Sequence, residues 1–125
     1  KMSNSSKELY DECSKYKKGD HSLERVRELV ANGADVNWKS RSNETGFMYA
    51  CIRNHVETVK YLITIERINV NLVNDDGWSG FYHACEYGNN EIVQILLDDP
   101  RVDIMLSDRN NWSPLMGAAY WGKTE

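Results

Sequence analysis

The sequence predicts an all-α solenoid of about three and a half helix–turn–helix units, stacked in a row and joined by short β-hairpin turns. Three observations support this prediction. The segment TGFMYAC at residues 45–51 recurs 34 residues later as SGFYHAC, and after another 34 residues as SPLMGAA. Apolar residues within each copy are three and four residues apart, as on one face of a helix. Polar, turn-forming residues separate the copies, so one unit is repeated along the chain.

Each unit is expected to open with a short helix. A hydroxyl side chain precedes it and can accept a hydrogen bond from a first-turn N–H; these caps are Thr45, Ser79 and Ser113. Phe47, Ala50 and Cys51 then share one helix face. Asn54 ends this helix in one copy, and Gly88 ends it in the next.

A second helix and a connector complete each unit. Residues 57–63 (ETVKYLI) match residues 91–97 (EIVQILL), and an earlier copy, ERVRELV, occupies residues 24–30. Val59, Leu62 and Ile63 have the spacing of a buried helix face. The connector recurs as ADVN, INVN and VDIM at residues 34–37, 68–71 and 102–105. Because helices and connectors agree at one period, chance similarity does not explain the pattern.

We expect one domain over residues 1–125, divided into a degenerate N-terminal unit at 7–39, repeats at 40–73 and 74–107, and an incomplete repeat at 108–125. In the first unit, a helix over residues 7–18 would turn Leu9, Cys13 and Tyr16 inward. The last unit stops before its second helix, so the chain is expected to be a fragment of a longer array. An uncovered end of this kind also allows self-association.

These repeats resemble the ankyrin repeat family, most clearly in residues 32–37 (NGADVN) and 84–93 (ACEYGNNEIV). The resemblance covers residues 19–125. It implies a right-handed stack whose turns project as β-hairpins, and a protein–protein interaction module with no enzymatic activity and no cofactor. The sequence departs from the family pattern in two respects. No copy keeps the histidine of the family's T-P-L-H segment, and Gly46 and Gly80 replace its proline, which leaves the first helical turn less restrained.

Charge restricts the choice of partner. Charged residues make up 27% of the chain and the net charge is −4, as in an ordinary folded protein. Residues 1–62 carry 11 basic and 9 acidic side chains, whereas residues 63–125 carry 4 and 10. An acidic half repels phosphate, so we expect a protein partner with basic and apolar anchors and no nucleic acid. No segment has the roughly 18 consecutive apolar residues of a membrane span, so no membrane partner is expected.

The cysteines indicate the compartment. Cys13, Cys51 and Cys85 are few and odd in number, and the first six residues have no apolar secretory signal. We therefore expect reduced thiols in an intracellular, cytoplasmic protein. Cys51 and Cys85 occupy the same inward position in successive units. They are expected to be free, because stacked helices lie about 8–10 Å apart and a disulfide requires Cα atoms within about 7 Å.

The resemblance also implies where a partner docks, because partners of ankyrin proteins contact the hairpin tips and the exposed side of the first helix. Aromatic residues there are favoured anchors, and acidic neighbours select Lys or Arg. An alternative for Trp78 and Trp112 is that they only pack on neighbouring hairpins. Trp38 is interpreted as structural, since its counterparts Leu72 and Leu106 are also apolar. The candidate partner-binding residues are Arg41, Arg53, Asp75, Asp76, Trp78, Glu86, Tyr87, Arg109, Trp112, Tyr120 and Trp121.

One motif suggests a different chemistry. Residues 117–124 (GAAYWGKT) satisfy G-x-x-x-x-G-K-T, the pattern of a phosphate-binding loop. That loop needs a strand before it and a helix N-terminus after it, whereas the repeat places residues 117–121 inside a helix. We expect no catalytic, cofactor-binding or metal-binding residues, and interpret His83 as a hydrogen-bonded helix residue. Two alternatives stay open, an adaptor or targeting segment of a larger enzyme or effector, and a nucleotide-binding enzyme that uses this motif.

Overall fold

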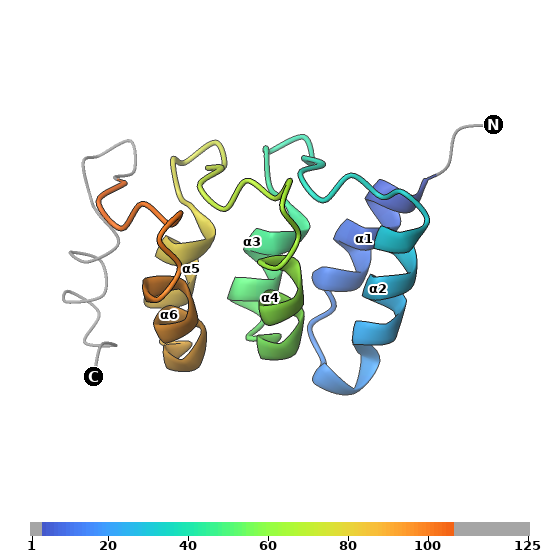
Figure 1. Ribbon diagram of the computed structural model, residues 1–125, viewed down its shortest axis with the longest axis horizontal. Helices are drawn as coiled ribbons and strands as arrows, with labels where there is room; N and C mark the ends of the chain where they lie inside the picture. The colour runs from blue at the N-terminus through green and yellow to red at the C-terminus, as the bar shows by residue number, and fades with distance from the viewer. Residues whose placement is uncertain (1–3, 107–125) are drawn as a thin grey trace.

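The computed structural model describes residues 4–106, and these form a row of paired helices (Figure 1). The first unit contains α1 (Ser5–Cys13), the short 3-10 helix η1 (Lys18–Asp20) and α2 (Leu23–Ala31); the second contains α3 (Gly46–Ile52) and α4 (Val56–Leu62); the third contains α5 (Gly80–Glu86) and α6 (Asn90–Leu97). The first helices pack as α1 on α3 and α3 on α5, and the second helices follow the same order. The predicted all-α repeat fold is confirmed.

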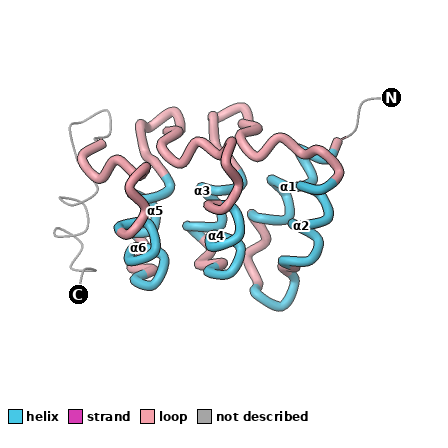
Figure 2. The backbone as a smooth tube through the Cα atoms, in the orientation of Figure 1, coloured by secondary structure: helices cyan, strands magenta, loops and turns pink. Residues whose placement is uncertain are grey.

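The loops that join one unit to the next gather along one edge of the stack (Figure 2). Within residues 4–106 the hairpin turns contain no extended strand, and a single antiparallel bridge, between Val73 and Ser79, closes the second hairpin. No helix among these residues is both long enough and apolar enough to cross a membrane.

The caps predicted for the described units form. The Thr45 hydroxyl accepts a hydrogen bond from the Met48 N–H at 3.1 Å, and the Ser79 hydroxyl accepts one from the Tyr82 N–H at 3.2 Å. Both satisfy a first-turn donor that has no partner inside the helix. After these helices, Asn54 and Gly88 adopt left-handed φ angles of 61° and 67°, which ends each helix and starts the turn to its partner.

Two glycines allow the units to approach each other closely. A Cβ atom on Gly80 would lie 2.7 Å from Phe47 Cε2 and 3.2 Å from Cys51 Sγ, and one on Gly46 would lie 3.3 Å from Cys13 Sγ. Glycine in place of proline lowers the restraint on the first helical turn. The packing gives a reason for glycine here, because each helix begins directly against the core of the preceding unit.

Two asparagines connect neighbouring units through the connectors. Asn37 Nδ2 donates to the Arg67 carbonyl at 2.9 Å, and its Oδ1 accepts from the Asn69 N–H at 2.8 Å. Asn71 repeats the arrangement one unit later, with the Arg101 carbonyl and the Asp103 N–H, each at 2.8 Å. These amides satisfy backbone groups that no helix can pair, so they hold the connectors in register.

The first unit differs from its prediction. Leu9 and Cys13 are buried as expected, but α1 ends at Cys13 instead of residue 18, and Tyr16 is 78% exposed. The cause is the longer loop that follows, which folds back over α1. The buried Glu12 carboxylate accepts a 2.6 Å hydrogen bond from the Ser22 N–H, and the His21 ring stacks on His55 of the next unit with 3.8 Å between centroids.

Candidate protein-binding surface

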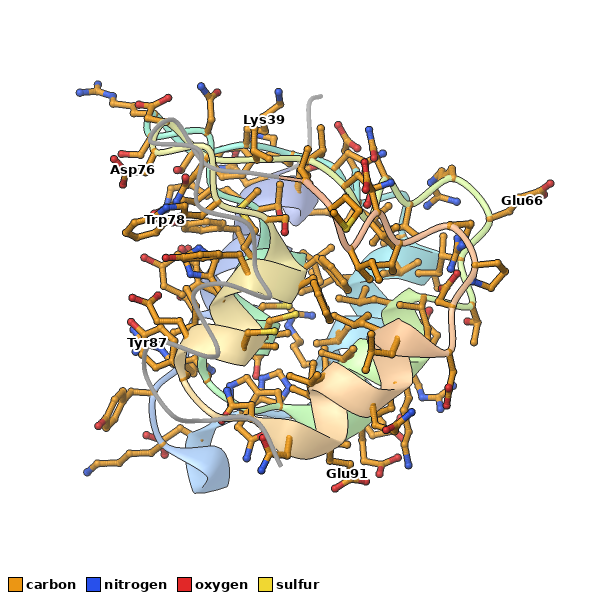
Figure 3. The ribbon with its side chains drawn as sticks, turned by 90° about the vertical axis from the view of Figure 1, so that its left-hand side faces the viewer. Lys39, Glu66, Asp76, Trp78, Tyr87 and Glu91 are labelled. Carbon is orange, nitrogen blue, oxygen red and sulfur yellow. The ribbon has the colours of Figure 1, made fainter. Side chains whose placement is uncertain are left out.

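The hairpin face is the surface formed by residues 38–44 and 72–78 together with the exposed side of α1, α3 and α5. Figure 3 shows Asp76, Trp78 and Tyr87 together on this side of the stack, whereas Glu66 and Glu91 point away from it on other sides. Asp75, Asp76, Trp78, Glu86 and Tyr87 all belong to the third unit, and Arg41 lies on the hairpin of the second. The predicted Arg109, Trp112, Tyr120, Trp121 and the motif at 117–124 lie outside the described residues.

Trp78 belongs to an aromatic row on the third unit. Its half-buried ring stacks on Tyr82 with 5.1 Å between centroids and meets the edge of His83 at 5.7 Å. Tyr87, at the end of α5, is 50% exposed, and its ring centroid lies 6.5 Å from that of His83. Trp78 therefore packs on the helix of its own unit while keeping part of its ring at the surface, where a partner can reach it.

His83 departs from its prediction. Its side chain is 5% exposed, yet neither ring nitrogen has a hydrogen-bond partner within the part of the chain that the structure describes. Nδ1 lies 3.8 Å from Glu86 Oε1, beyond hydrogen-bond distance. The interpretation of His83 as a hydrogen-bonded helix residue is therefore wrong. Its neighbours are the aromatic rings of Trp78, Tyr82 and Tyr87.

Arg53 acts between the first and second units. Its guanidinium carbon lies 5.0 Å from the Tyr16 ring centroid and 5.3 Å from that of Tyr49, and its Nε donates to the Ser14 carbonyl at 3.1 Å. Tyr49 in turn donates to Glu44 Oε1 at 3.2 Å. Burial raises the pKa of Tyr49 to about 12, and the Glu44 carboxylate adds to the effect. Arg53 is thus half-buried and fixed by cation–π contacts.

Hydrogen bonds fix the two hairpins relative to each other. The Asp75 N–H donates to the Ser42 carbonyl at 3.1 Å, and Asn43 Nδ2 donates to Asp75 Oδ1 at 2.7 Å. The side chains of Arg41, Asp75 and Asp76 are exposed. A partner that crosses both hairpins therefore meets a preorganised pair of charged tips.

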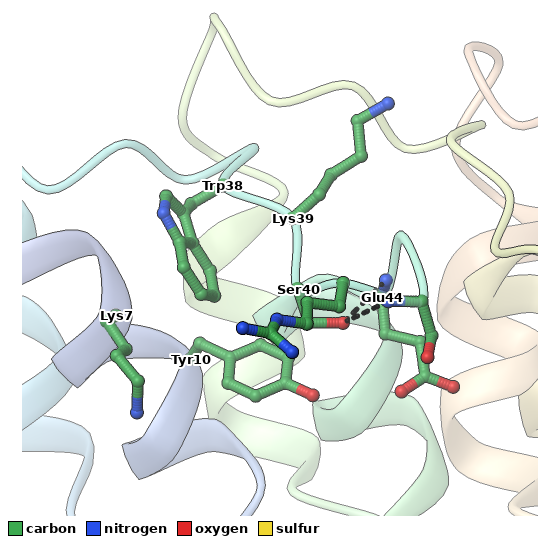
Figure 4. Close-up of a pocket in the computed structure, with 8 residues that line it drawn as sticks. Lys7, Tyr10, Trp38, Lys39, Ser40 and Glu44 are labelled. Atoms are coloured by element: carbon green, nitrogen blue, oxygen red, sulfur yellow. Dashed lines mark hydrogen bonds between the residues drawn. The ribbon is translucent and has the colours of Figure 1, made fainter.

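A groove beside Trp38 was not among the predicted sites. It is lined by Lys7, Tyr10, Trp38, Lys39, Arg41 and Glu44, among others, and Trp38 meets Tyr10 edge-on with 5.4 Å between centroids (Figure 4). Trp38 is half-buried, so the structural interpretation describes only part of its role. A signal was present in the sequence. Trp38 stands where the other units have leucine, and the indole N–H disfavours complete burial.

The buried thiols lack nucleophilic character at neutral pH. All three cysteines are free and buried. Burial, with a smaller effect of the Glu12 charge, raises the pKa of Cys13 to about 12, and burial alone raises that of Cys85 to about 11. Burial also raises the pKa of Cys51. Because the thiolate is the reactive form, these residues contribute core volume at neutral pH. Among residues 4–106, no group of three His, Cys, Asp or Glu side chains is placed to hold a metal ion.

Comparison with known proteins agrees with this geometry. The family described as ankyrin repeats (3 copies) matches residues 13–108 and 64–125. A search of curated proteins finds no match. Ankyrin repeats generally serve as protein–protein interaction modules, and the two matched ranges together cover residues 13–125. The chain belongs to the ankyrin repeat family.

Proposed function

We propose that this chain is a protein–protein interaction module that docks its partner on the hairpin face. The observation that carries the proposal is a difference between positions 34 residues apart. Positions inside the stack keep their character, as in Phe47 and Phe81, whereas positions on the hairpin face change from Glu44 to Trp78 and from Arg53 to Tyr87. The second unit has a charged residue at each of these two positions, so the stack does not require a large aromatic residue there, and a partner supplies the reason for it.

The binding mechanism is rigid docking. Backbone hydrogen bonds, asparagine contacts between connectors and packed helices hold the hairpin face in place before the partner arrives. A preordered surface loses little conformational entropy on association, so more of the contact energy contributes to affinity. Trp78 and Tyr87 are the proposed anchors, because they offer large areas with few rotatable bonds.

The charges of the third unit favour a partner with basic and apolar anchors. Asp75 and Asp76 are exposed on the hairpin, and the half-buried Glu86 is the last residue of α5, at the end away from the hairpin. Such carboxylates attract Lys or Arg and repel phosphate backbones. On the 34-residue period alone, the proposal extends to Arg109, Trp112, Tyr120 and Trp121 in the fourth unit.

The test is capture of a partner by the immobilised chain from a cell lysate, quantified by mass spectrometry. We expect Trp78→Ala combined with Tyr87→Ala to lower capture by about tenfold or more, the loss typical of removing anchor residues. The matched control is Glu57→Ala with Glu91→Ala, on α4 and α6. Circular dichroism checks that the helices persist in both variants. If the aromatic variant stays folded and captures as the wild type does, or if the control loses capture equally, the proposal fails.

A further inference from the structure

The hairpin face reverses its charge from one hairpin to the next. Residues 34 apart occupy equivalent positions, so Arg41 on the first hairpin corresponds to Asp75 on the second. The first hairpin carries Lys39 and Arg41, and the second carries Asp75 and Asp76, all of them exposed. Because hydrogen bonds join the two hairpins, one partner that crosses them meets both signs of charge.

The positive charge of the first hairpin is available to a partner. Neither Lys39 nor Arg41 forms an ion pair within residues 4–106. Lys7 pairs with Asp11 at 3.1 Å, and the Glu44 carboxylate accepts the hydroxyl of Tyr49 while keeping its negative charge. With Lys39, Arg41 and Glu44 in its lining, the groove therefore keeps an excess of positive charge.

The floor of this groove suits a side chain with an apolar stem. Trp38 and Tyr10 meet edge-to-face and form an aromatic surface between the first hairpin and α1 (Figure 4). The ring of Tyr10 is held from its other side by Tyr49, with 5.6 Å between centroids. A Glu or Asp side chain that lies across these rings can direct its carboxylate to Lys39 or Arg41, and a guanidinium such as that of Arg41 can bind it through two parallel hydrogen bonds.

We propose that the groove beside Trp38 receives an acidic segment of the same partner whose basic anchors bind at Asp75, Asp76 and Trp78. The inference rests on the proposed function, and it adds the charge order of the partner. Stacked helices lie about 8–10 Å apart and an extended peptide advances about 3.3 Å per residue, so about three residues separate the two charged segments. A partner of one charge throughout is repelled by one of the two hairpins.

A peptide suits this surface better than a nucleic acid or a lipid surface. Both of those present continuous negative charge, and Asp75 and Asp76 on the adjoining hairpin oppose it. A peptide can place an acidic segment over Lys39 and Arg41 and change sign within one unit. The opposite charges therefore also fix the direction in which the partner lies along the stack.

The experiment is selection of peptides from a random display library on the wild-type chain, on Lys39→Glu with Arg41→Glu, and on Trp78→Ala. The wild-type pool should contain an acidic cluster and a basic cluster about three residues apart. The Lys39/Arg41 variant should keep the basic cluster and lose the acidic one. A synthetic peptide from the wild-type pool should bind this variant about tenfold more weakly, because like charges then face each other. A control with the same change of charge away from the hairpin face, Arg27→Glu with Lys60→Glu on α2 and α4, should leave its affinity unchanged, with circular dichroism to check that its helices persist.

The possible failures are distinguishable. If the wild-type pool depends on Trp78 but lacks the acidic cluster, this inference is overturned and the proposed function stands. The same holds if peptides selected on the Lys39/Arg41 variant still carry the acidic cluster. A pool that Trp78→Ala does not alter overturns the proposed function, and this inference with it. A further outcome is that the chain binds phosphatidylserine vesicles while the pool contains no acidic peptides. If Lys39→Glu with Arg41→Glu abolishes that binding, the groove binds lipid, and this inference is overturned.

Discussion

The second and third units have the same backbone plan and different hairpin-face side chains. Their buried positions correspond closely, as the pairs Thr45 and Ser79, Phe47 and Phe81, and Cys51 and Cys85 show. Their hairpin-face positions differ in charge or shape, as the pairs Arg41 and Asp75, Glu44 and Trp78, and Arg53 and Tyr87 show. The stack restricts the first group because each member packs against a neighbouring unit. It leaves the second group free to specify a partner.

Inside the core, equivalent positions of the two units are not equally enclosed. Cys51 is 0% exposed and Cys85 is 4% exposed. Burial raises the pKa of both thiols, but the increase for Cys85, to about 11, is the smaller of the two. Repetition of a residue therefore does not guarantee repetition of its environment.

The largest predicted effect is a loss of stability at alkaline pH. A raised thiol pKa means that, as pH rises above 9.0, the unfolded chain releases its protons while the folded chain keeps them. The free energy of unfolding should fall with pH by up to about 1.4 kcal/mol per pH unit for each thiol. The decrease ends near pH 11 for Cys85 and near pH 12 for Cys13, where the thiol of the folded chain also loses its proton.

Urea unfolding at intervals from pH 8 to 10.5 measures this effect. Tyrosines and lysines also titrate in this range, so the informative quantity is the difference between the wild type and Cys51→Ala or Cys85→Ala. Each substitution should make the pH dependence shallower by up to about 1.4 kcal/mol per pH unit. Parallel profiles for the wild type and both variants would show that the folded chain does not protect these thiols.

A smaller difference is expected between the interface of the first and second units, at Gly46, and that of the second and third units, at Gly80. Substitution by alanine should cost more stability at Gly80. At Gly80 an added methyl group would meet the buried Phe47 ring at 2.7 Å, so Gly80→Ala should lower the free energy of unfolding by about 1–3 kcal/mol. At Gly46 the nearest atom, Cys13 Sγ, is 3.3 Å away. Alanine also restricts the unfolded chain more than glycine does, and this gain of about 0.4–1 kcal/mol should there offset much of the strain. Equal losses for both variants in urea unfolding would contradict the difference in packing.

Much of the fold could be predicted from the sequence because it depends on local rules. The 34-residue period, the caps at Thr45 and Ser79 and the helix ends at Asn54 and Gly88 all follow from nearby residues. The early end of α1 could not be predicted in this way. It depends on Glu12 binding the Ser22 backbone across a loop with no counterpart in the other units.

The candidate site was predictable only in part. The period placed Trp78 and Tyr87 on the surface, because they stand at positions that the core does not use. It did not reveal the groove beside Trp38, since that groove forms only when Tyr10 of α1 meets the first hairpin. Nor did it reveal that His83 is enclosed by aromatic rings, which depends on the packing of Trp78 and Tyr82 around it.

The most direct test of the hairpin face as the binding surface is an NMR titration of the 15N-labelled chain with a peptide obtained by selection. The amide signals that shift should belong to residues 38–44, to residues 72–78, and to α5 with the Tyr87 that follows it. Signals of α2, α4 and α6 should stay in place. Shifts concentrated on α4 and α6, around Lys60 and Glu91, with the two hairpins unchanged, would contradict the proposed surface.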